Sequence, residues 1–289
     1  MSGIRPMSFG EILDGSLTLY RRNFGVFLRL AIASLIVPVL LIAYFMIFML
    51  NQLMMAVMMM MIDPILIAMI VLIVVTYIVG TLMMTAGTIR VISDSYLNRP
   101  TTFGQAIGLG VSKIWPLFLV GIAKGILLAL LGIVVGGLLA VGGPMLAGSG
   151  AVGTVVIVVL AIVGVWFCIW VAAGYGVTTP VIVLETLGGS FEAFGRSWGL
   201  TRGSRGKVVG LFIVATLLFS VVPQFILQFI AGAVMTSSPG AGMAILFASY
   251  LLPIVLYPAI SCVVTLMYYD LRVRREAFDL QMLSQQLGG

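Results

Sequence analysis

Few side chains in this sequence have the chemistry that catalysis needs. The chain contains no histidine, and its two cysteines, Cys168 and Cys262, each lie inside an apolar run without a basic neighbour that could activate the thiol. Its nine acidic residues are scattered near the ends of apolar segments, with no spacing that would gather several around one metal ion. We therefore expect no enzyme activity, no catalytic residue, no metal site and no cofactor.

The basic residues instead indicate a membrane topology. Of the fifteen Lys and Arg residues, all except Lys124 fall in four patches, at 5–29, 90–113, 196–207 and 272–275. The connections at 51–63, 142–151 and 236–242 contain none. Because cytoplasmic loops carry an excess of Lys and Arg, the pattern predicts a bacterial inner-membrane protein that crosses the bilayer several times and has both termini in the cytoplasm.

Composition predicts the same class of protein. The chain is 62% hydrophobic and 8% charged, whereas about 25% of the residues in a soluble domain are charged. Apolar runs of at least about 18 residues predict six transmembrane helices in an all-α fold. The expected spans are Phe27–Leu50, Ile65–Ile89, Leu117–Val141, Ala151–Ala173, Val208–Met235 and Met243–Tyr269.

An internal repeat organises these spans. A hydroxyl residue precedes Phe at Ser8-Phe9, Thr102-Phe103 and Ser190-Phe191, and a basic residue follows some ten to fourteen positions later. We expect residues 1–289 to form a single membrane domain of three units, near 8–100, 101–189 and 190–289. Each unit would consist of an interfacial amphipathic helix followed by a hairpin of two transmembrane helices.

Helix-capping patterns support the interfacial helices. Ser8 with Glu11 and Thr102 with Gln105 fit the capping box, in which two side chains satisfy the free backbone N–H groups of a helix start. The third segment is weaker, because Ala193 stands where the box needs Glu or Gln. The alternative is that these segments are solvated loops that serve only to orient the chain.

Lys124 is the one charge that lies deep in a predicted span. Its side chain could reach back toward the basic side of the membrane or make a polar contact with another helix. An ion or substrate site is the alternative, since charges inside a membrane often mark transport pathways. Pro223, Pro253 and Pro258 could break spans five and six around such a site, although prolines also produce plain kinks in membrane helices.

Two further patterns predict helix packing. Small residues recur at four-residue intervals on the third span, and polar residues do so on the fifth. The first pattern lets helix backbones approach closely, and the second would leave amides unsatisfied in lipid unless another helix covers them. The residues that we assign to a helix interface or an intramembrane polar site are Gly121, Lys124, Gly125, Gly132, Gly136, Gln224 and Gln228.

The net charge of +6 does not indicate a nucleic-acid partner, because the basic residues flank apolar spans rather than form one soluble face. Anionic lipid headgroups or an acidic partner surface are the expected counter-charges. The residues that we assign to this contact are Arg21, Arg22, Arg202, Arg205, Lys207, Arg272, Arg274 and Arg275.

Both ends of the chain resemble a widespread bacterial family. The segments that carry the resemblance are Arg5–Asp14 leading to Leu19–Phe24, the middle stretch Trp198–Gly203, and the closing stretch Tyr268–Leu280. They are similar to the glycerophosphoryl diester phosphodiesterase membrane domain family. The resemblance implies a six-span membrane module that stands alone, without the catalytic barrel of the fused members. The absence of histidine from the sequence agrees with that implication.

These observations predict a non-enzymatic integral membrane protein. We expect it to be a scaffold, an assembly partner or a lipid-associated accessory protein, and to form a homo-oligomer or join a larger membrane complex. The alternative is a transporter or channel subunit. A transporter needs a hydrated, polar-lined cavity near mid-membrane around Lys124 or Gln224, whereas a scaffold needs a closed bundle with an exposed helix face.

Overall fold

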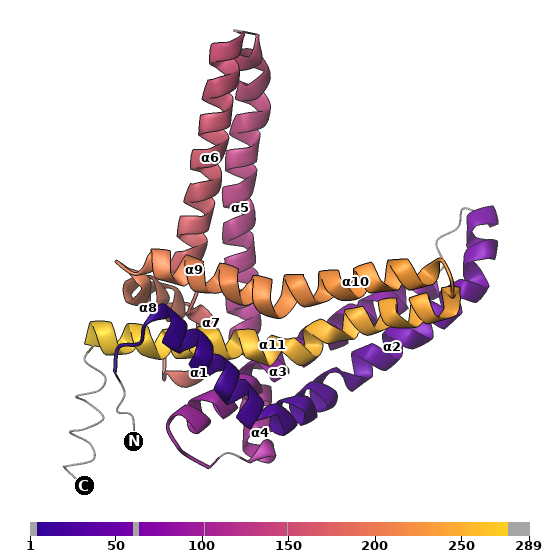
Figure 1. Cartoon of the computed structure of the whole chain (residues 1–289), viewed down its shortest axis with the longest axis horizontal. Helices are drawn as coiled ribbons and strands as arrows, with labels where there is room; N and C mark the ends of the chain where they lie inside the picture. Colours follow the sequence, from indigo (N-terminus) through magenta and orange to yellow (C-terminus); the bar gives the residue numbers. More distant parts are fainter. Residues whose placement is uncertain (1–4, 60–63, 101, 149, 277–289) are drawn as a thin grey trace. The chain divides into compact units, whose positions relative to one another are not determined.

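The chain is helical throughout the part that the structure describes. The structure is a computed structural model that describes residues 5–59, 64–100, 102–148 and 150–276, with only the backbone described for residues 47–59 and 147. No strand occurs in these ranges. The elements, shown in Figure 1, are α1 (Phe9–Arg22), α2 (Phe24–Met59), α3 (Pro64–Tyr96), α4 (Phe103–Ser112), α5 (Ile114–Ala147), α6 (Ala151–Gly174), α7 (Thr178–Leu184), α8 (Glu192–Thr201), α9 (Arg205–Thr216), the π-helical η1 (Leu217–Val221), α10 (Val222–Met235) and α11 (Pro239–Glu276).

Six segments are long and apolar enough to cross a membrane, which confirms the predicted multi-pass, all-α class. They are Phe24–Met46, Pro64–Tyr96, Ile114–Leu146, Ala151–Leu184, Arg205–Met235 and Pro239–Glu276. Most extend beyond the predicted apolar runs, and at the ends of α3 and α11 the helix continues through charged residues that pair along its own surface. Arg90 and Asp94, one turn apart near the end of α3, illustrate this with an Nε–Oδ2 distance of 2.7 Å.

A short helix begins at or directly after each of the three phenylalanines that mark the predicted repeat. Helix α1 begins at Phe9, α4 at Phe103, and α8 directly after Phe191. The capping box of α4 is complete, with Thr102 and Gln105 each bonding the other's backbone N–H. Ser8 and Glu11 make the same two bonds at α1, whereas α8 has no side-chain cap. The segments are therefore helices rather than loops, while their position on the membrane surface and the three-fold repeat stay predictions.

The described chain divides into two compact units. Unit 1 consists of residues 5–16, 116–217 and 263–276, and unit 2 of residues 17–115 and 218–262. The chain passes from one unit to the other inside α1, near the start of α5, within η1 and inside α11. These boundaries differ from those of the three predicted repeat units.

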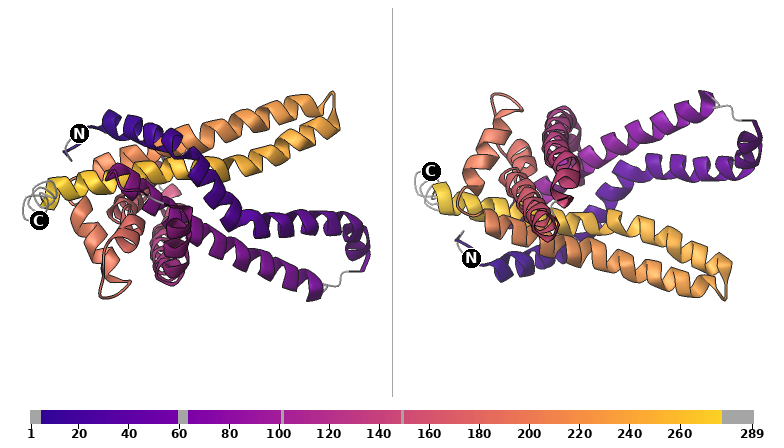
Figure 2. Two further views of the ribbon diagram at one scale, coloured as in Figure 1. Left: turned by 90° about the horizontal axis from the view of Figure 1, so that it is seen from below. Right: turned by 90° about the horizontal axis from the view of Figure 1, so that it is seen from above.

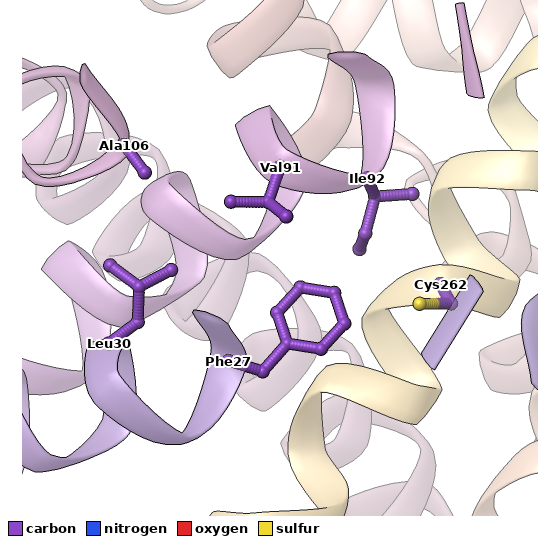
Figure 3. Close-up of a cluster of buried hydrophobic side chains, with 6 residues drawn as sticks. All are labelled: Phe27, Leu30, Val91, Ile92, Ala106 and Cys262. Atoms are coloured by element: carbon purple, nitrogen blue, oxygen red, sulfur yellow. The ribbon is translucent and has the colours of Figure 1, made fainter. Parts of the chain in front are cut away.

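The core of unit 2 is apolar. Helices α2 and α3 form one long pair, and α10 and the first part of α11 form another (Figure 2). Their contact is filled by Phe27 and Leu30 of α2, Val91 and Ile92 of α3, Ala106 of α4 and Cys262 of α11, none of them more than 2% exposed (Figure 3). Cys262 is thus a small apolar core residue, as the sequence indicated.

Unit 1 contains the long α5–α6 pair together with α7, α8, α9 and the end of α11. Helices α5 and α6 run side by side (Figure 1), and a side chain at Gly164 of α6 would collide with Val135 of α5. A turn at Tyr175–Val177 ends α6 and starts the buried helix α7, which the hydropathy pattern did not predict. This turn and the loop after α7 place Glu185 and α8 beside the end of α11.

The prolines affect their helices differently. Pro38, Pro253 and Pro258 lie within uninterrupted helices. Pro223 instead stands at the start of α10, directly after the π-helical turn η1. Because proline has no N–H and its ring collides with the carbonyl four residues earlier, the backbone there widens into π geometry. Span five is therefore locally irregular, whereas span six is not.

Candidate functional site

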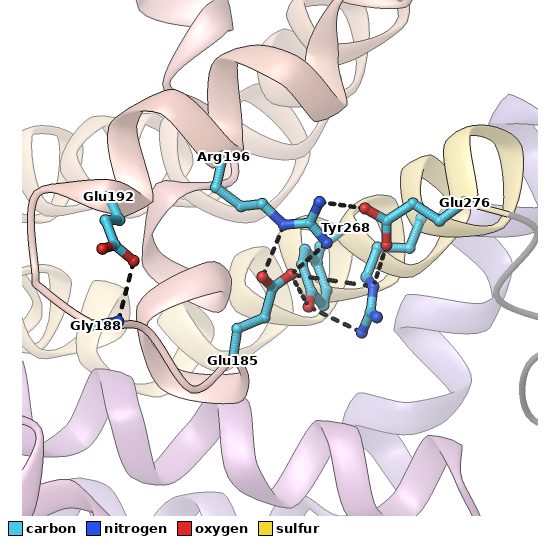
Figure 4. A network of polar contacts seen from close by, with 7 residues as sticks. Glu185, Gly188, Glu192, Arg196, Tyr268 and Glu276 are labelled. Carbon is cyan, nitrogen blue, oxygen red and sulfur yellow. Dashed lines mark hydrogen bonds and ion pairs between the residues drawn. The ribbon is translucent and has the colours of Figure 1, made fainter.

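An ion-pair network in unit 1 is the densest group of charged residues in the described chain (Figure 4). Glu185, just after α7, accepts a bond from Arg196 Nε of α8 at 2.8 Å and one from the Tyr268 hydroxyl of α11 at 2.8 Å. Glu276 pairs with Arg196 and with Arg272, whose Nε lies 3.1 Å from its carboxylate. We call these five residues the Glu185 network.

The spacing along α11 explains why three of the five residues meet. Tyr268, Arg272 and Glu276 stand four residues apart and share one helix face. Arg272 donates to both of its neighbours, at 3.3 Å to the Tyr268 hydroxyl and at 3.1 Å to Glu276. Hydrogen bonds from Arg196 to the carboxylates of Glu276 and Glu185 raise the pKa of its guanidinium above the usual value. Arg196 therefore stays charged and joins α8 to α7 and α11.

A second group, the Asp270 cluster, lies on the opposite face of α11, because two residues correspond to about 200° of helix rotation. Asp270 is fully buried and accepts from the Met7 backbone N–H at 2.7 Å, from Lys207 Nζ at 2.5 Å and from Arg274 Nε at 3.0 Å. Lys207 and Arg274 also donate to the Met7 carbonyl, at 2.7 and 2.8 Å. One carboxylate thus joins the N-terminal segment, α9 and α11.

Arg205 is held by aromatic rings rather than by a carboxylate. Only 6% of its surface is exposed, and its guanidinium carbon lies 3.7 Å from the Trp198 ring and 4.8 Å from the Trp170 ring. Its Nε has no hydrogen-bond partner among the described residues. A side chain at Gly174 would overlap the Trp198 ring, so this glycine makes room for the tryptophan. The cation–π contacts replace part of the hydration that Arg205 loses.

Lys124 contacts the end of a neighbouring helix. Its Nζ donates to the carbonyl oxygen of Tyr175 at 2.9 Å, directly after the last residue of α6. A cation at this position interacts favourably with the free carbonyls and the negative end of the helix dipole. The contact agrees with one of the interpretations that the sequence allowed for Lys124, a polar contact with another helix.

The small-residue face of α5 has no neighbour in the described chain. A Cβ atom added at Gly121, Gly125, Gly132 or Gly136 would meet nothing within 4 Å. In the apolar windows of the third and fourth spans, 6% and 0% of the residues are buried, against 33% in the first. The close packing that the spacing predicts is therefore not supplied by the described residues.

The polar residues of the fifth span are only partly covered. Gln224 is half-buried and Gln228 exposed, and neither amide makes a hydrogen bond to the described residues. Both follow the irregular turn η1 by less than three helical turns.

The predicted basic contact residues fall into two groups. Arg21, Arg22, Arg202 and Arg275 are exposed. Lys207, Arg272 and Arg274 pair with carboxylates of unit 1, and Arg205 is buried between tryptophans. Sequence reasoning did not single out Glu185, Arg196 or Asp270 as members of a site. Only the four-residue spacing on α11 could have pointed to part of it.

Neither network has the composition of a metal or catalytic centre. No group of three or more His, Cys, Asp or Glu side chains that could hold a metal ion occurs among the described residues. Every carboxylate in the two networks is instead paired with an arginine or lysine. Comparisons of the chain with protein-family models, with curated proteins and with solved structures find no match. The arrangement is suited to holding helix ends together.

Proposed function

We propose that the protein is a non-catalytic integral membrane protein that works by association, and that the small-residue face of α5 is where a second membrane helix packs. The observation that carries the proposal is the empty space beside Gly121, Gly125, Gly132 and Gly136. Backbones that can approach closely gain van der Waals contact, which drives helix association in lipid.

The other contacts of α5 support this assignment. The helix already packs against α6 through a different face, where Val135 meets Gly164 and Lys124 reaches Tyr175. Successive residues are about 100° apart, so the glycine face lies to one side of the α6 contact. Pairing with α6 therefore leaves the small-residue face available to a second helix.

A second copy of this chain is the proposed occupant. Faces with small residues at four-residue intervals are self-complementary, and most soluble and membrane oligomers that pair like faces are two-fold symmetric. We propose further that the protein resides in a bacterial inner membrane, with the basic connections and both termini in the cytoplasm. The resemblance to stand-alone membrane modules of the glycerophosphoryl diester phosphodiesterase membrane domain family supports this setting.

Disulfide cross-linking in native membranes tests the pairing. In a background without Cys168 and Cys262, a cysteine at Ala129, on the same face as Gly125 and Gly132, should give a covalent dimer under mild oxidation. Leu130 is about 100° further round the helix and 56% exposed, so a cysteine there is the matched control and should give little dimer.

A bulky substitution provides the second arm. Gly125→Leu in the Ala129→Cys background should reduce the dimer, whereas Gly137→Leu, which adds the same side chain at another glycine with open space, should not. Equal cross-linking from Ala129 and Leu130, or equal loss from both leucine variants, would refute a specific α5 interface. Cross-links only to another protein would replace the second copy by a hetero-partner.

Transport is the second candidate, favoured by one observation. Span five has a π-helical turn next to Pro223, followed by the unbonded amides of Gln224 and Gln228. Irregular membrane helices with polar side chains often line transport sites. Solute flux in proteoliposomes that disappears in Lys124→Ala or Gln224→Leu, with only monomer recovered from membranes, would establish transport and reject assembly.

The proposed orientation has its own test. Single cysteines at Gly150 and Ser238 lie in connections without basic residues and should react with a membrane-impermeant reagent added to intact cells. A cysteine at Ser204, between Arg202 and Arg205, should react only after the cells are opened. The reverse pattern would invert the topology.

A further inference from the structure

A polar cavity of about 350 Å³ lies within unit 2, where α1 ends, α2 begins and α3 ends. Five of its eight lining residues are polar or charged. The lining residues are Arg22, Asn23, Val26, Val91, Ser95, Asn98, Arg99 and Pro100. The Glu185 network and the Asp270 cluster have no residue in it.

Hydrogen bonds fix the walls of this cavity. The Asn23 side-chain amide donates to the Leu19 carbonyl at 2.9 Å and to Ser95 Oγ at 3.0 Å. Because Ser95 Oγ accepts that bond, its own hydroxyl hydrogen can point elsewhere and donate. Asn98 adopts a left-handed conformation, with φ of 53°, and the Arg99 N–H bonds the Asp94 carbonyl at 2.7 Å. These contacts hold Asn98 and Arg99 at the rim.

The charges that face the cavity are all positive. Arg22 and Arg99 are exposed, and neither guanidinium group has an ion-pair or hydrogen-bond partner in the described chain. No carboxylate lines the cavity, and the nearest one in sequence, Asp94, is paired with Arg90 at 2.7 Å. Helices α1 and α3 end at the cavity and α2 begins there, so their dipoles add no net positive field and the attraction rests on the two guanidinium groups. Two guanidinium groups without a counter-ion are a strong attraction for one anion.

We propose that this cavity binds a phosphate group, and that the phosphate belongs to the headgroup of an anionic membrane lipid. Planar guanidinium groups match phosphate geometry with paired N–H bonds, and the Ser95 hydroxyl supplies a further donor. The site lies at the ends of two membrane-spanning helices, α2 and α3. That is the level at which lipid phosphates meet protein, and the partly exposed Val26 of the lining suits the apolar part of a lipid below its headgroup.

Lipid binding to the purified full-length protein tests the site. Native mass spectrometry would count phosphatidylglycerol and phosphatidylcholine bound from mixed micelles, and thermal unfolding would measure the stabilisation that each lipid gives. We expect a preference for phosphatidylglycerol, and a loss of about tenfold in its affinity in the double variant Arg22→Gln, Arg99→Gln. In a separate measurement, inorganic phosphate is added without lipid, and its effect on thermal unfolding distinguishes free phosphate from a lipid headgroup.

A matched control separates the cavity from general surface charge. The double variant Arg5→Gln, Arg29→Gln removes two exposed arginines that neither line the cavity nor belong to the predicted lipid-contact residues, and it changes the net charge equally. It should retain the preference for phosphatidylglycerol. Asn98→Asp adds a carboxylate at the rim in a conformation that Asp also tolerates, and it should weaken binding without removing either arginine.

Each outcome decides the question. If only the cavity variants lose the preference for phosphatidylglycerol, the proposed site is supported. Asn98→Asp gives that answer even if the variant that lacks Arg22 and Arg99 fails to fold. Equal loss in the control variant would reduce the effect to surface charge and overturn the proposal. Stabilisation by inorganic phosphate at millimolar concentration, without a preference for phosphatidylglycerol, would keep the phosphate chemistry and reject the lipid as its source. These results do not depend on whether α5 mediates assembly.

Discussion

Each of the two units has its own kind of internal contact. Unit 1 joins the ends of α8, α9 and α11 through carboxylates that each bind more than one cation, whereas the best-packed part of unit 2 is an apolar cluster around Phe27. The charged contacts of unit 1 are largely hidden from solvent, with Asp270 fully buried and the side chain of Glu185 only 14% exposed. Buried ion pairs therefore stabilise unit 1, and apolar packing stabilises unit 2.

The difference shows what each kind of contact can do in a membrane protein. Apolar side chains gain little from leaving lipid, so the cluster of unit 2 depends on close fit. A buried ion pair must be complete, because a single partner left behind is a charge without water. Unit 1 should therefore be sensitive to the loss of one functional group, and unit 2 to the loss or gain of volume.

The largest expected effect is in the Asp270 cluster. Asp270→Ala would leave Lys207, Arg274 and the Met7 N–H without their shared acceptor. Breaking a buried pair by removing one partner should lower the free energy of unfolding by about 3–5 kcal/mol. Unfolding of the detergent-solubilised protein in SDS would measure it. Arg5→Ala, which breaks a surface pair with Glu11, is the control and should cost about 0–1 kcal/mol. Similar losses in both would contradict the comparison.

Apolar packing in unit 2 should give the next largest effect. Phe27 is 1% exposed at the centre of its cluster, so Phe27→Ala leaves a cavity. The loss should be about 2–4 kcal/mol, at or below the values in water-soluble cores, because lipid is a better alternative than water for the displaced ring. Phe225 is 69% exposed, so Phe225→Ala should change the same unfolding measurement little. A larger loss in Phe225→Ala would show that this face is covered.

Adding a methyl group to the packed interior of unit 2 should lower the free energy of unfolding by a smaller amount. Gly80 of α3 packs directly on the Ser34 carbonyl oxygen of α2, and a Cβ there would overlap it. Gly80→Ala should therefore lower the free energy of unfolding by about 1–3 kcal/mol. Gly137→Ala adds the same methyl group where nothing lies within 4 Å and off the proposed α5 interface, and it should be neutral or stabilising by up to about 1 kcal/mol through helix propensity. The opposite order would mean that α2 and α3 separate easily.

Much of the fold follows from local patterns in the sequence. Long apolar runs predicted six spans, and hydroxyl–Phe motifs placed the starts of α1, α4 and α8. Both patterns act within a few turns of helix, where hydrogen bonding and hydropathy decide the outcome. Helix α7 was missed because it is only seven residues long and continues an apolar run.

The candidate sites could be predicted less well from the sequence, because the residues that form them are far apart along the chain. Asp270 binds Met7 and Lys207, which stand 263 and 63 residues away, and no periodicity along the chain predicts those pairs. The cavity of unit 2 could not be predicted for the same reason, because its two arginines, Arg22 and Arg99, are far apart in the sequence. Basic residues were treated as one surface set, although Lys207 and Arg205 are used inside unit 1. The charge pattern predicts that these residues face the cytoplasm, which stays a prediction, but it does not predict what each one contacts.

The smallest expected effect is a difference between the two capping boxes in how their stabilising contribution depends on pH. Hydrogen bonds from the Ser8 backbone and side chain, followed by that from Arg5, lower the pKa of the Glu11 carboxyl from 4.5 to about 2. A lowered folded-state pKa means that the stabilising contribution is complete above about pH 4.5 and is lost as the pH falls toward 2. The box of α4 uses Gln105, which does not titrate, so it should not change over that window.

An NMR titration of the Glu11 carboxyl carbon checks this directly. Its midpoint should lie near pH 2 and not near 4.5, and the Thr102 amide signal should not follow it. Ser8→Ala removes the hydroxyl but keeps the backbone donor, so the midpoint should rise only part of the way toward 4.5. Arg5→Gln should raise it less, since the bond to Arg5 is the smaller cause. A midpoint near 4.5 in the unaltered protein would show that the box at α1 is open in solution, and α4 would then be the only short helix with a closed box among the three described.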